Sequence, residues 1–359
     1  MREGVSIVIC TYNGAALLPE TIRHIAQQRV DPKISWELVV IDNASTDNTS
    51  EIAVTEWRKH GSPAPFILLQ ESKQGLTYAR ALALQEAQYD FVLFCDDDNW
   101  LEENYVNLAY QCMMQHPRVG ALGGHGTLVF ETPPPVWAKG HGLFANGPQA
   151  KASGIVPNHI VYGAGCVIRK TAYNKLIQSG FKPTLTDRKG GKLSSGGDYE
   201  LCYAIALAGY SIWYERKLTF RHFMPSSRIR WEFYKRFIKE GLQCYEVIVP
   251  YRLRVSMGAK NLFSFYAKAM WILLSYILRL FPVLFHKFKS RPGSDMAEYY
   301  SLKLYSLKHK IFIFRKINSM RQSFLEILEF EEQNLGVTRF SKLPDLSSQL
   351  NKIRTLLVR

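Results

Sequence analysis

Three consecutive carboxylates, Asp96, Asp97 and Asp98, follow directly on the apolar run 91–95. A short apolar run bounded by polar residues predicts a buried strand, and open α/β sheets bind ligands at the carboxyl ends of such strands. Carboxylates this close together raise one another's pKa unless a cation compensates their charge. Oxygen ligands of this kind favour Mg²⁺ or Mn²⁺. The triplet therefore predicts a divalent-metal site, with a solvated acidic turn as the alternative.

Strand-like and helix-like segments alternate through the first hundred residues. Helical spacing occurs at 17–25 and 76–87, residues 43–47 resemble a capped helix start, and apolar runs that predict strands lie at 5–10, 36–41, 66–69 and 91–95. Alternation at this pitch predicts an α/β fold, with a doubly wound, mostly parallel central sheet and helices on both faces.

The pattern becomes irregular beyond Trp100. The Pro-rich and Gly-containing segment 131–154 predicts a long loop over the site. Strand character returns at 160–168, and a loop rich in Gly, Lys and Ser at 186–197 precedes a helix at 198–209. A strand at 212–220 then leads into Arg221, His222 and Phe223. No internal repeat is visible.

The composition is that of an ordinary folded protein, with 359 residues, 47% of them hydrophobic and 21% charged. Six cysteines are scattered without a C-x-x-C pair or zinc-ligand spacing. The residues before Val5 do not have the layout of a signal peptide. We therefore expect buried or free thiols and a cytoplasmic location.

The positive charge is concentrated near the C-terminus. Residues 250–359 hold 19 Lys and Arg against 7 Asp and Glu, so +12 of the net +14 lies there. They include the uncharged segment 269–278, which Arg279 interrupts and which is followed by Pro282. A spanning helix needs about 20 apolar residues. We expect a helix at an anionic membrane surface, with a buried helix or a re-entrant segment as alternatives, and no nucleic acid partner.

Five motifs, in order, resemble the inverting family 2 glycosyltransferases, which have the GT-A fold. The likeness covers roughly residues 4–245, and its motifs are VSIVICTYN at 5–13, VIDNASTD at 40–47, Gly75 with Ala79-Arg80, the triplet 96–98, and GDYEL at 197–201. Each motif is weak alone, and their order and spacing carry the resemblance. It implies a GT-A-like catalytic domain at 1–245, followed by a basic, mainly helical region at 246–359.

The resemblance also implies the roles of the acidic triplet. In the family, an Asp-x-Asp motif holds a metal that binds the donor diphosphate, and here its frame is Asp96-x-Asp98. Asp98 is the implied direct ligand of Mn²⁺ or Mg²⁺, Asp96 the implied ribose contact, and Asp97 an additional donor contact. His222 is implied as a further ligand of the metal or the diphosphate, with a structural histidine as the alternative. The metal would stabilise the leaving diphosphate.

Residue types at the other motifs suit a nucleoside diphosphate sugar. Asp42 can accept a hydrogen bond from a ribose hydroxyl or a base N–H. Thr11 and Tyr12, with the adjacent Asn13, can line the base, and Arg80 can approach the phosphates. Helix capping and turn formation are the alternatives for Asp42 and Thr11. A surface salt bridge is the alternative for Arg80.

Sugar transfer also needs a base for the acceptor hydroxyl, and the resemblance implies Asp198. The family often has Glu before this Asp; here Gly197 stands there, which leaves Glu200 as a rival. Residues two apart on a helix point in different directions, so we expect only one of the two to act. A helix N-terminal carboxylate facing the dipole is the alternative for Asp198. Trp100 and Trp137 are candidates for stacking on a sugar, with core packing as the alternative.

Together these features predict a metal-dependent, inverting glycosyltransferase at the inner face of the cell membrane. Its expected donor is a nucleoside diphosphate sugar, UDP-sugar first by family frequency, and its expected acceptor is a glycan, plausibly lipid-linked, of a bacterial surface polysaccharide. The alternative is a catalytically inactive protein that binds sugar nucleotides or carbohydrates on the same fold. The Gly-rich phosphate loop of dinucleotide oxidoreductases does not follow the first strand.

Overall fold

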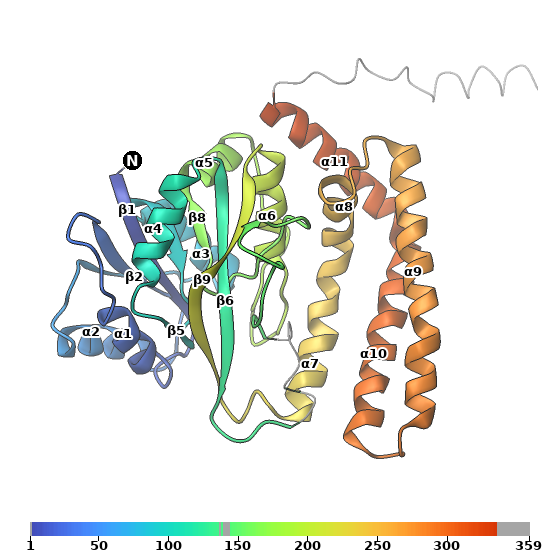
Figure 1. Cartoon of the computed structure of the whole chain (residues 1–359), viewed down its shortest axis with the longest axis horizontal. Coiled ribbons are helices and arrows are strands. Elements are labelled where there is room, and N and C mark those ends of the chain that lie inside the picture. Colours follow the sequence, from blue (N-terminus) through green and yellow to red (C-terminus); the bar gives the residue numbers. More distant parts are fainter. Residues whose placement is uncertain (1, 136–137, 139–143, 336–359) are drawn as a thin grey trace, which may run out of the picture.

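The computed structural model describes residues 2–135, 138 and 144–335. Within them a central nine-stranded sheet carries helices on its faces, and a group of long helices stands beside it (Figure 1). Trp137, one of the stacking candidates, lies outside the described residues, as do residues 336–359 of the basic C-terminal region.

Four parallel strands form the N-terminal half of the sheet, in the order β3-β2-β1-β4. They are β1 (Arg2–Thr11), β2 (Trp36–Asp42), β3 (Phe66–Gln70) and β4 (Tyr89–Phe94). The helices between them are α1 (Leu18–Ala26), α2 (Thr49–Lys59) and α3 (Leu76–Glu86). The interiors of β1, β2 and β4 are buried, as continuous apolar runs predict. The predicted strand–helix alternation is confirmed.

The second half of the sheet is mixed. It continues as β8-β6-β9-β5, with β8 antiparallel to β4 and β6, β6 parallel to β9, and β5 and β7 antiparallel to β9. These strands are β5 (Asn99–Leu101), β6 (Val119–Phe130), β7 (Gly154–Ile155), β8 (Val167–Arg169) and β9 (Ser211–Met224). The strand expected at 160–168 is wrong for most of its length, because only its end is extended.

The irregular pattern expected after Trp100 is also wrong. Helix α4 (Tyr105–Gln115) follows it, and the 12-residue β6 comes next. Glycines conceal the strand pattern of β6, and close packing accounts for them. A Cβ added at Gly124 would lie 2.4 Å from the Tyr105 hydroxyl and 2.5 Å from the Leu218 carbonyl oxygen. The strand therefore needs residues without side chains where other elements approach its backbone.

Replacing Gly124 with alanine is expected to lower the free energy of unfolding by about 1–3 kcal/mol, because the added methyl group overpacks the core against a backbone atom. Denaturant unfolding measures this loss. Gly241→Ala is the matched control, since its Cβ would meet only the Ser195 hydroxyl, at 3.2 Å. Equal stability losses in the two variants would contradict the packing argument.

The C-terminal half contributes seven α-helices to the described residues. They are α5 (Lys170–Gln178), α6 (Gly197–Leu207), α7 (Trp231–Gly241), α8 (Tyr245–Val255), α9 (Leu262–Lys289), α10 (Asp295–Phe312) and α11 (Ile317–Leu335). Helices α8, α9 and α11 share a core of their own, which includes Leu253, Phe265 and Phe324. The predicted helical C-terminal region is confirmed, and it packs beside the sheet (Figure 1).

Candidate active site

The carboxyl ends of β1, β2 and β4 bring several predicted residues to one edge of the sheet. Thr11 pairs with Asp42 in the β1–β2 register, and the Cys95 amide donates to the Val8 carbonyl at 2.9 Å. The Thr11 hydroxyl donates to the Asp97 carboxylate at 2.6 Å. Thr11 is therefore hydrogen-bonded to the acidic triplet. The polar residues expected at the strand ends lie close together, as the sequence predicts.

Asp98 lies in a buried contact with two basic side chains. Its Oδ2 accepts from the Arg228 guanidinium, and its Oδ1 lies 3.4 Å from His222 Nε2. The β5–β9 register pairs Asn99 with His222, and the Phe223 amide donates to the Asp98 carbonyl at 2.8 Å. These backbone contacts hold Asp98 and His222 next to each other. His222 Nδ1 lies 2.6 Å from the Phe144 carbonyl oxygen. Since a carbonyl only accepts, Nδ1 donates and Nε2 faces Asp98.

Asp97 and Asp98 do not titrate alike. Burial raises the pKa of Asp98, but His222 and Arg228 outweigh it and hold that pKa below its usual value. Burial, followed by the charge of Asp98, raises the pKa of Asp97 to about 7 despite its bond from Thr11. Asp98 therefore stays ionised at neutral pH. This is the protonation state that a metal ligand requires.

The pair of Asp98 and His222 fits a divalent cation. Asp98 Oδ1 is buried and has no hydrogen-bond partner among the described residues. The bond from His222 Nδ1 to a carbonyl is the arrangement typical of metal-ligating histidines. No cluster of three or more His, Cys, Asp or Glu side chains suited to a metal occurs in the described part of the chain. Two protein ligands fit a cation that completes its shell with water and substrate phosphates.

Asp198 lies in the first turn of α6, after Gly196 at φ 114°. Its Oδ2 accepts from the Gly163 amide at 2.8 Å, and its Oδ1 accepts from the Tyr199 amide at 2.9 Å. The Cys166 amide in turn donates to the Gly163 carbonyl at 3.1 Å. Burial raises the pKa of Asp198, and the charge of Arg80 offsets part of this rise. The residue remains partly exposed.

Glu200, the rival base, is 1% exposed. Its two oxygens accept from the amides of Thr184 and Leu185 at 2.9 to 3.1 Å. The Glu200 carboxylate thus fixes the loop before α6. Both of its oxygens are occupied by backbone amides, so neither is placed to take a proton from an acceptor hydroxyl. The environment of Glu200 favours Asp198 as the base.

Arg80 lies inside the site and forms no surface salt bridge. Its guanidinium is 3.9 Å from the Asp187 carboxylate, and a Cβ at Gly163 would approach it to 2.5 Å. Burial lowers the pKa of Arg80, but Asp96, Asp198 and Asp187 outweigh it. Burial lowers the pKa of His222, but Asp98, with a smaller contribution from Asp96, outweighs it. Asp96 is therefore close enough to act electrostatically on both the Asp198 side and the Asp98 side of the site.

The residues expected to contact the nucleotide bind the segment after β2. Asp42 accepts from the Ser45 amide at 2.9 Å and from the Ser50 hydroxyl at 2.5 Å. Asn13, at φ 53°, accepts from the Thr46 amide at 2.8 Å. Tyr12 is 44% exposed. Tyr12 and Asn13 are exposed, and the bond from the Ser45 amide to Asp42 is the turn contact considered as its alternative.

Sequence reasoning missed two charged residues of the site. Arg228 lies in a loop after β9, and no motif in the sequence indicates its contact with Asp98. Asp187 accepts from the Gly197 amide at 2.9 Å, and burial followed by Asp198 raises its pKa to about 6.

Trp100 stacks between His24 and Phe223, at centroid distances of 5.6 and 5.2 Å, so core packing describes it.

Comparison with known proteins places the N-terminal part of the chain in a family. The model of Glycosyl transferase family 2 matches residues 6–177. Glycosyltransferase GlyG of Streptococcus pneumoniae serotype 4 is 26% identical over 125 residues, which are 35% of this chain and 40% of that protein. Cholesterol galactosyltransferase of Borreliella burgdorferi is 31% identical over 107 residues, which are 30% of this chain and 28% of that protein.

A third relative also has a solved structure. The poly(ribitol-phosphate) beta-N-acetylglucosaminyltransferase TarS of Staphylococcus aureus is 30% identical over 111 residues, which are 31% of this chain and 19% of that protein. The chain thus spans less than half the length of these three relatives. The crystal structure of TarS residues 1–349 has the same fold, with a TM-score of 0.50 and 16% identity, and covers 95% of this chain and 94% of that one.

Proposed function

Because residues 6–177 match the model of Glycosyl transferase family 2, we propose that the chain is a glycosyltransferase that transfers a sugar, with inversion, from a nucleoside diphosphate sugar to a glycan hydroxyl. One observation carries this proposal. Hydrogen bonds through Gly163 and Cys166 connect the partly exposed carboxylate of Asp198 to the end of β4, and this strand leads to Asp98 and its contact with His222. A base and a site for the leaving diphosphate are thus held together.

The donor binds at the ends of β1, β2 and β4. Asp98 and His222 would hold a divalent cation, Mn²⁺ or Mg²⁺, which would stabilise negative charge on the leaving diphosphate. Arg228 adds a fixed positive charge beside Asp98, suited to phosphate oxygens. Asp96 binds a ribose hydroxyl, and the exposed ring of Tyr12 packs on the base. Thr11 and Asp97 hold the edge of this surface through their hydrogen bond.

The acceptor hydroxyl meets Asp198, which removes its proton as the oxygen attacks the anomeric carbon. A single displacement from the side opposite the diphosphate inverts the configuration. The amides of Gly163 and Tyr199 hold the carboxylate in place. Arg80 balances the charges of Asp198 and Asp96, and Asp187 fixes the start of α6 through Gly197.

The sugar and the acceptor are proposed by class. The name of the TarS relative describes N-acetylglucosaminyl transfer to poly(ribitol phosphate), which supports a surface glycan as the acceptor class. A UDP-sugar is the first donor to test, since UDP-sugars are the commonest donors in this family. The alternative function is an inactive protein that binds a sugar nucleotide without turning it over.

Thermal unfolding with a panel of nucleoside diphosphates tests donor binding. One of them, with Mn²⁺ present, is expected to stabilise the protein, by about 2.7 kcal/mol when its concentration is 100 times its Kd. EDTA should remove most of this stabilisation. Absence of stabilisation by any nucleotide would contradict the proposal. Release of sugar from a radiolabelled donor separates an enzyme from an inactive binder, because only the enzyme consumes the donor.

A further inference from the structure

Helix α9 has one buried face and one exposed face. Phe265, Ala269, Ile272 and Tyr276 belong to the core that α9 shares with α8 and α11. The helix runs unbroken for 28 residues, although the sequence places Pro282 within it. The packed residues recur at a spacing of three or four, so the opposite side of α9 faces away from this core.

The exposed side of α9 is mostly apolar, and Arg279 is the exposed charged residue in its middle. Its exposed fractions reach 84% at Phe263 and 92% at Phe288. We call this surface the α9 outer face, and it comprises Phe263, Tyr266, Met270, Trp271, Leu274, Ile277, Leu278, Phe281, Leu284, Phe285 and Phe288. It extends along a helix about 42 Å long. Figure 1 shows α9 at the edge of the molecule farthest from β1. Soluble proteins rarely leave so long an apolar surface uncovered.

A spanning orientation would break the packing of α9. The helix is long and apolar enough to cross a membrane, with a mean hydropathy of 1.6 in its best window, of which 17% is buried. Its inner face, however, contacts other helices of the described structure; the rings of Phe265 and Phe324 lie 4.8 Å apart. Insertion across a bilayer would separate these rings. A helix that lies along a surface keeps them together and still covers the outer face.

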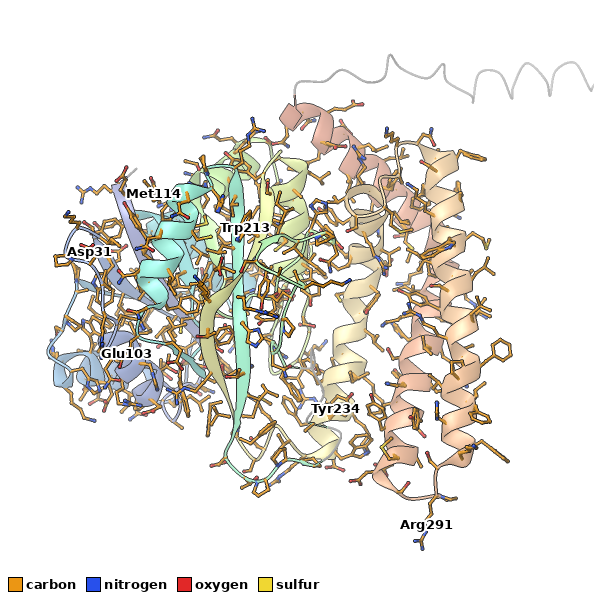
Figure 2. The ribbon with its side chains drawn as sticks, in the orientation of Figure 1. Asp31, Glu103, Met114, Trp213, Tyr234 and Arg291 are labelled. Atoms are coloured by element: carbon orange, nitrogen blue, oxygen red, sulfur yellow. The ribbon has the colours of Figure 1, made fainter. Side chains whose placement is uncertain are left out.

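The charges around α9 indicate which surface covers it. Residues 247–294 contain eight Lys and Arg and no Asp or Glu. The exposed ones at the two ends of α9 are Lys260, Lys287, Lys289 and Arg291, and Figure 2 shows Arg291 at the turn after the helix. A second copy docked through the same face would oppose like charges. An anionic lipid surface complements them and accepts the apolar side chains as well.

We propose that the α9 outer face binds an anionic membrane surface, with the helix parallel to the bilayer plane and the aromatic and aliphatic side chains inserted among the headgroups. The basic residues at the ends of α9 contact the lipid phosphates. This inference does not depend on the proposed reaction, because it rests on the exposed face and the charge of residues 247–294.

Co-sedimentation of the full chain with phospholipid vesicles tests the proposal. Little protein is expected to bind vesicles of phosphatidylcholine alone, and the bound fraction should rise as phosphatidylglycerol is added and fall as salt is added. The triple variant Lys287→Glu, Lys289→Glu, Arg291→Glu is expected to lower the partition coefficient by about 10²-fold. Its matched control reverses three exposed lysines outside the C-terminal helices: Lys33, Lys151 and Lys182.

Loss of apolar contact is tested separately. Leu274→Ser with Phe281→Ser leaves the charge and the buried face of α9 unchanged, and is expected to abolish vesicle binding. The control, Ile155→Ser with Ile177→Ser, changes exposed apolar residues outside α9 and should leave vesicle binding unchanged. Three results would overturn the proposal. They are no binding to any vesicle, binding that ignores lipid charge and salt, and a dimer that Leu274→Ser with Phe281→Ser dissociates.

Discussion

Replacing Asp198 with asparagine is expected to lower kcat by about 10²- to 10⁴-fold, while the KM for the donor stays near its wild-type value. The amide has nearly the same shape and can still accept from the Gly163 amide, but it cannot take a proton from the acceptor hydroxyl. Steady-state kinetics with a defined donor and acceptor measure this separation of kcat from KM.

Glu200→Gln is the matched control for Asp198→Asn, since both remove one carboxylate from α6. It should keep kcat and lose stability instead, because Glu200 accepts three backbone bonds in a buried position. Burial raises the pKa of Asp198, and a base must be deprotonated, so wild-type kcat should fall as pH drops through that raised pKa. A normal kcat in Asp198→Asn with a collapsed kcat in Glu200→Gln would reverse the assignment.

Removal of the metal is expected to abolish transfer in the wild-type protein, and Mn²⁺ or Mg²⁺ should restore it. Asp98→Ala should lose transfer by on the order of 10³-fold, which corresponds to about 4 kcal/mol of transition-state stabilisation, and added metal should not rescue it. The reason is that Asp98 Oδ1 is buried, has no hydrogen-bond partner among the described residues and lies 3.4 Å from His222 Nε2.

Binding of Mn²⁺, followed by electron paramagnetic resonance in the presence of nucleotide, gives a readout that does not require turnover. Asp98→Asn and His222→Ala should both weaken it. Thermal unfolding of Asp98→Asn checks that the fold survives, because the loss of its charge leaves Arg228 unpaired in the site. Full transfer activity in EDTA would show that Asp98 acts without a metal.

The parallel half of the sheet was predictable because its strands are buried on both faces. Such strands appear in sequence as uninterrupted apolar runs, and the acidic triplet marks where one of them ends. The glycine-rich β6 was not predictable. Glycine is needed there because Tyr105 and Leu218 pack closely against the backbone of the strand, and sequence spacing does not reveal these contacts.

The site was predictable where a motif places a residue directly at the end of a strand or the start of a helix. Asp98 and Asp198 are of this kind. Arg228 and Asp187 are not, since loops bring them to their partners. The choice between Asp198 and Glu200 was open in the sequence, because only the fold shows that Glu200 is enclosed by the backbone of Thr184 and Leu185.

The connection between Asp198 and the sheet is short. Asp198 accepts from Gly163, Gly163 accepts from Cys166, and the Cys166 carbonyl accepts from the Phe94 amide at the end of β4 at 2.8 Å. Three hydrogen bonds therefore hold the base in register with the strand that leads to Asp96. The segments 145–153 and 188–195 are not links in this chain of bonds, and they include neither Phe144, which contacts His222, nor Asp187, which contacts Gly197. Evolution can accordingly rebuild those loops for a new acceptor while the spacing between base and leaving group stays constant.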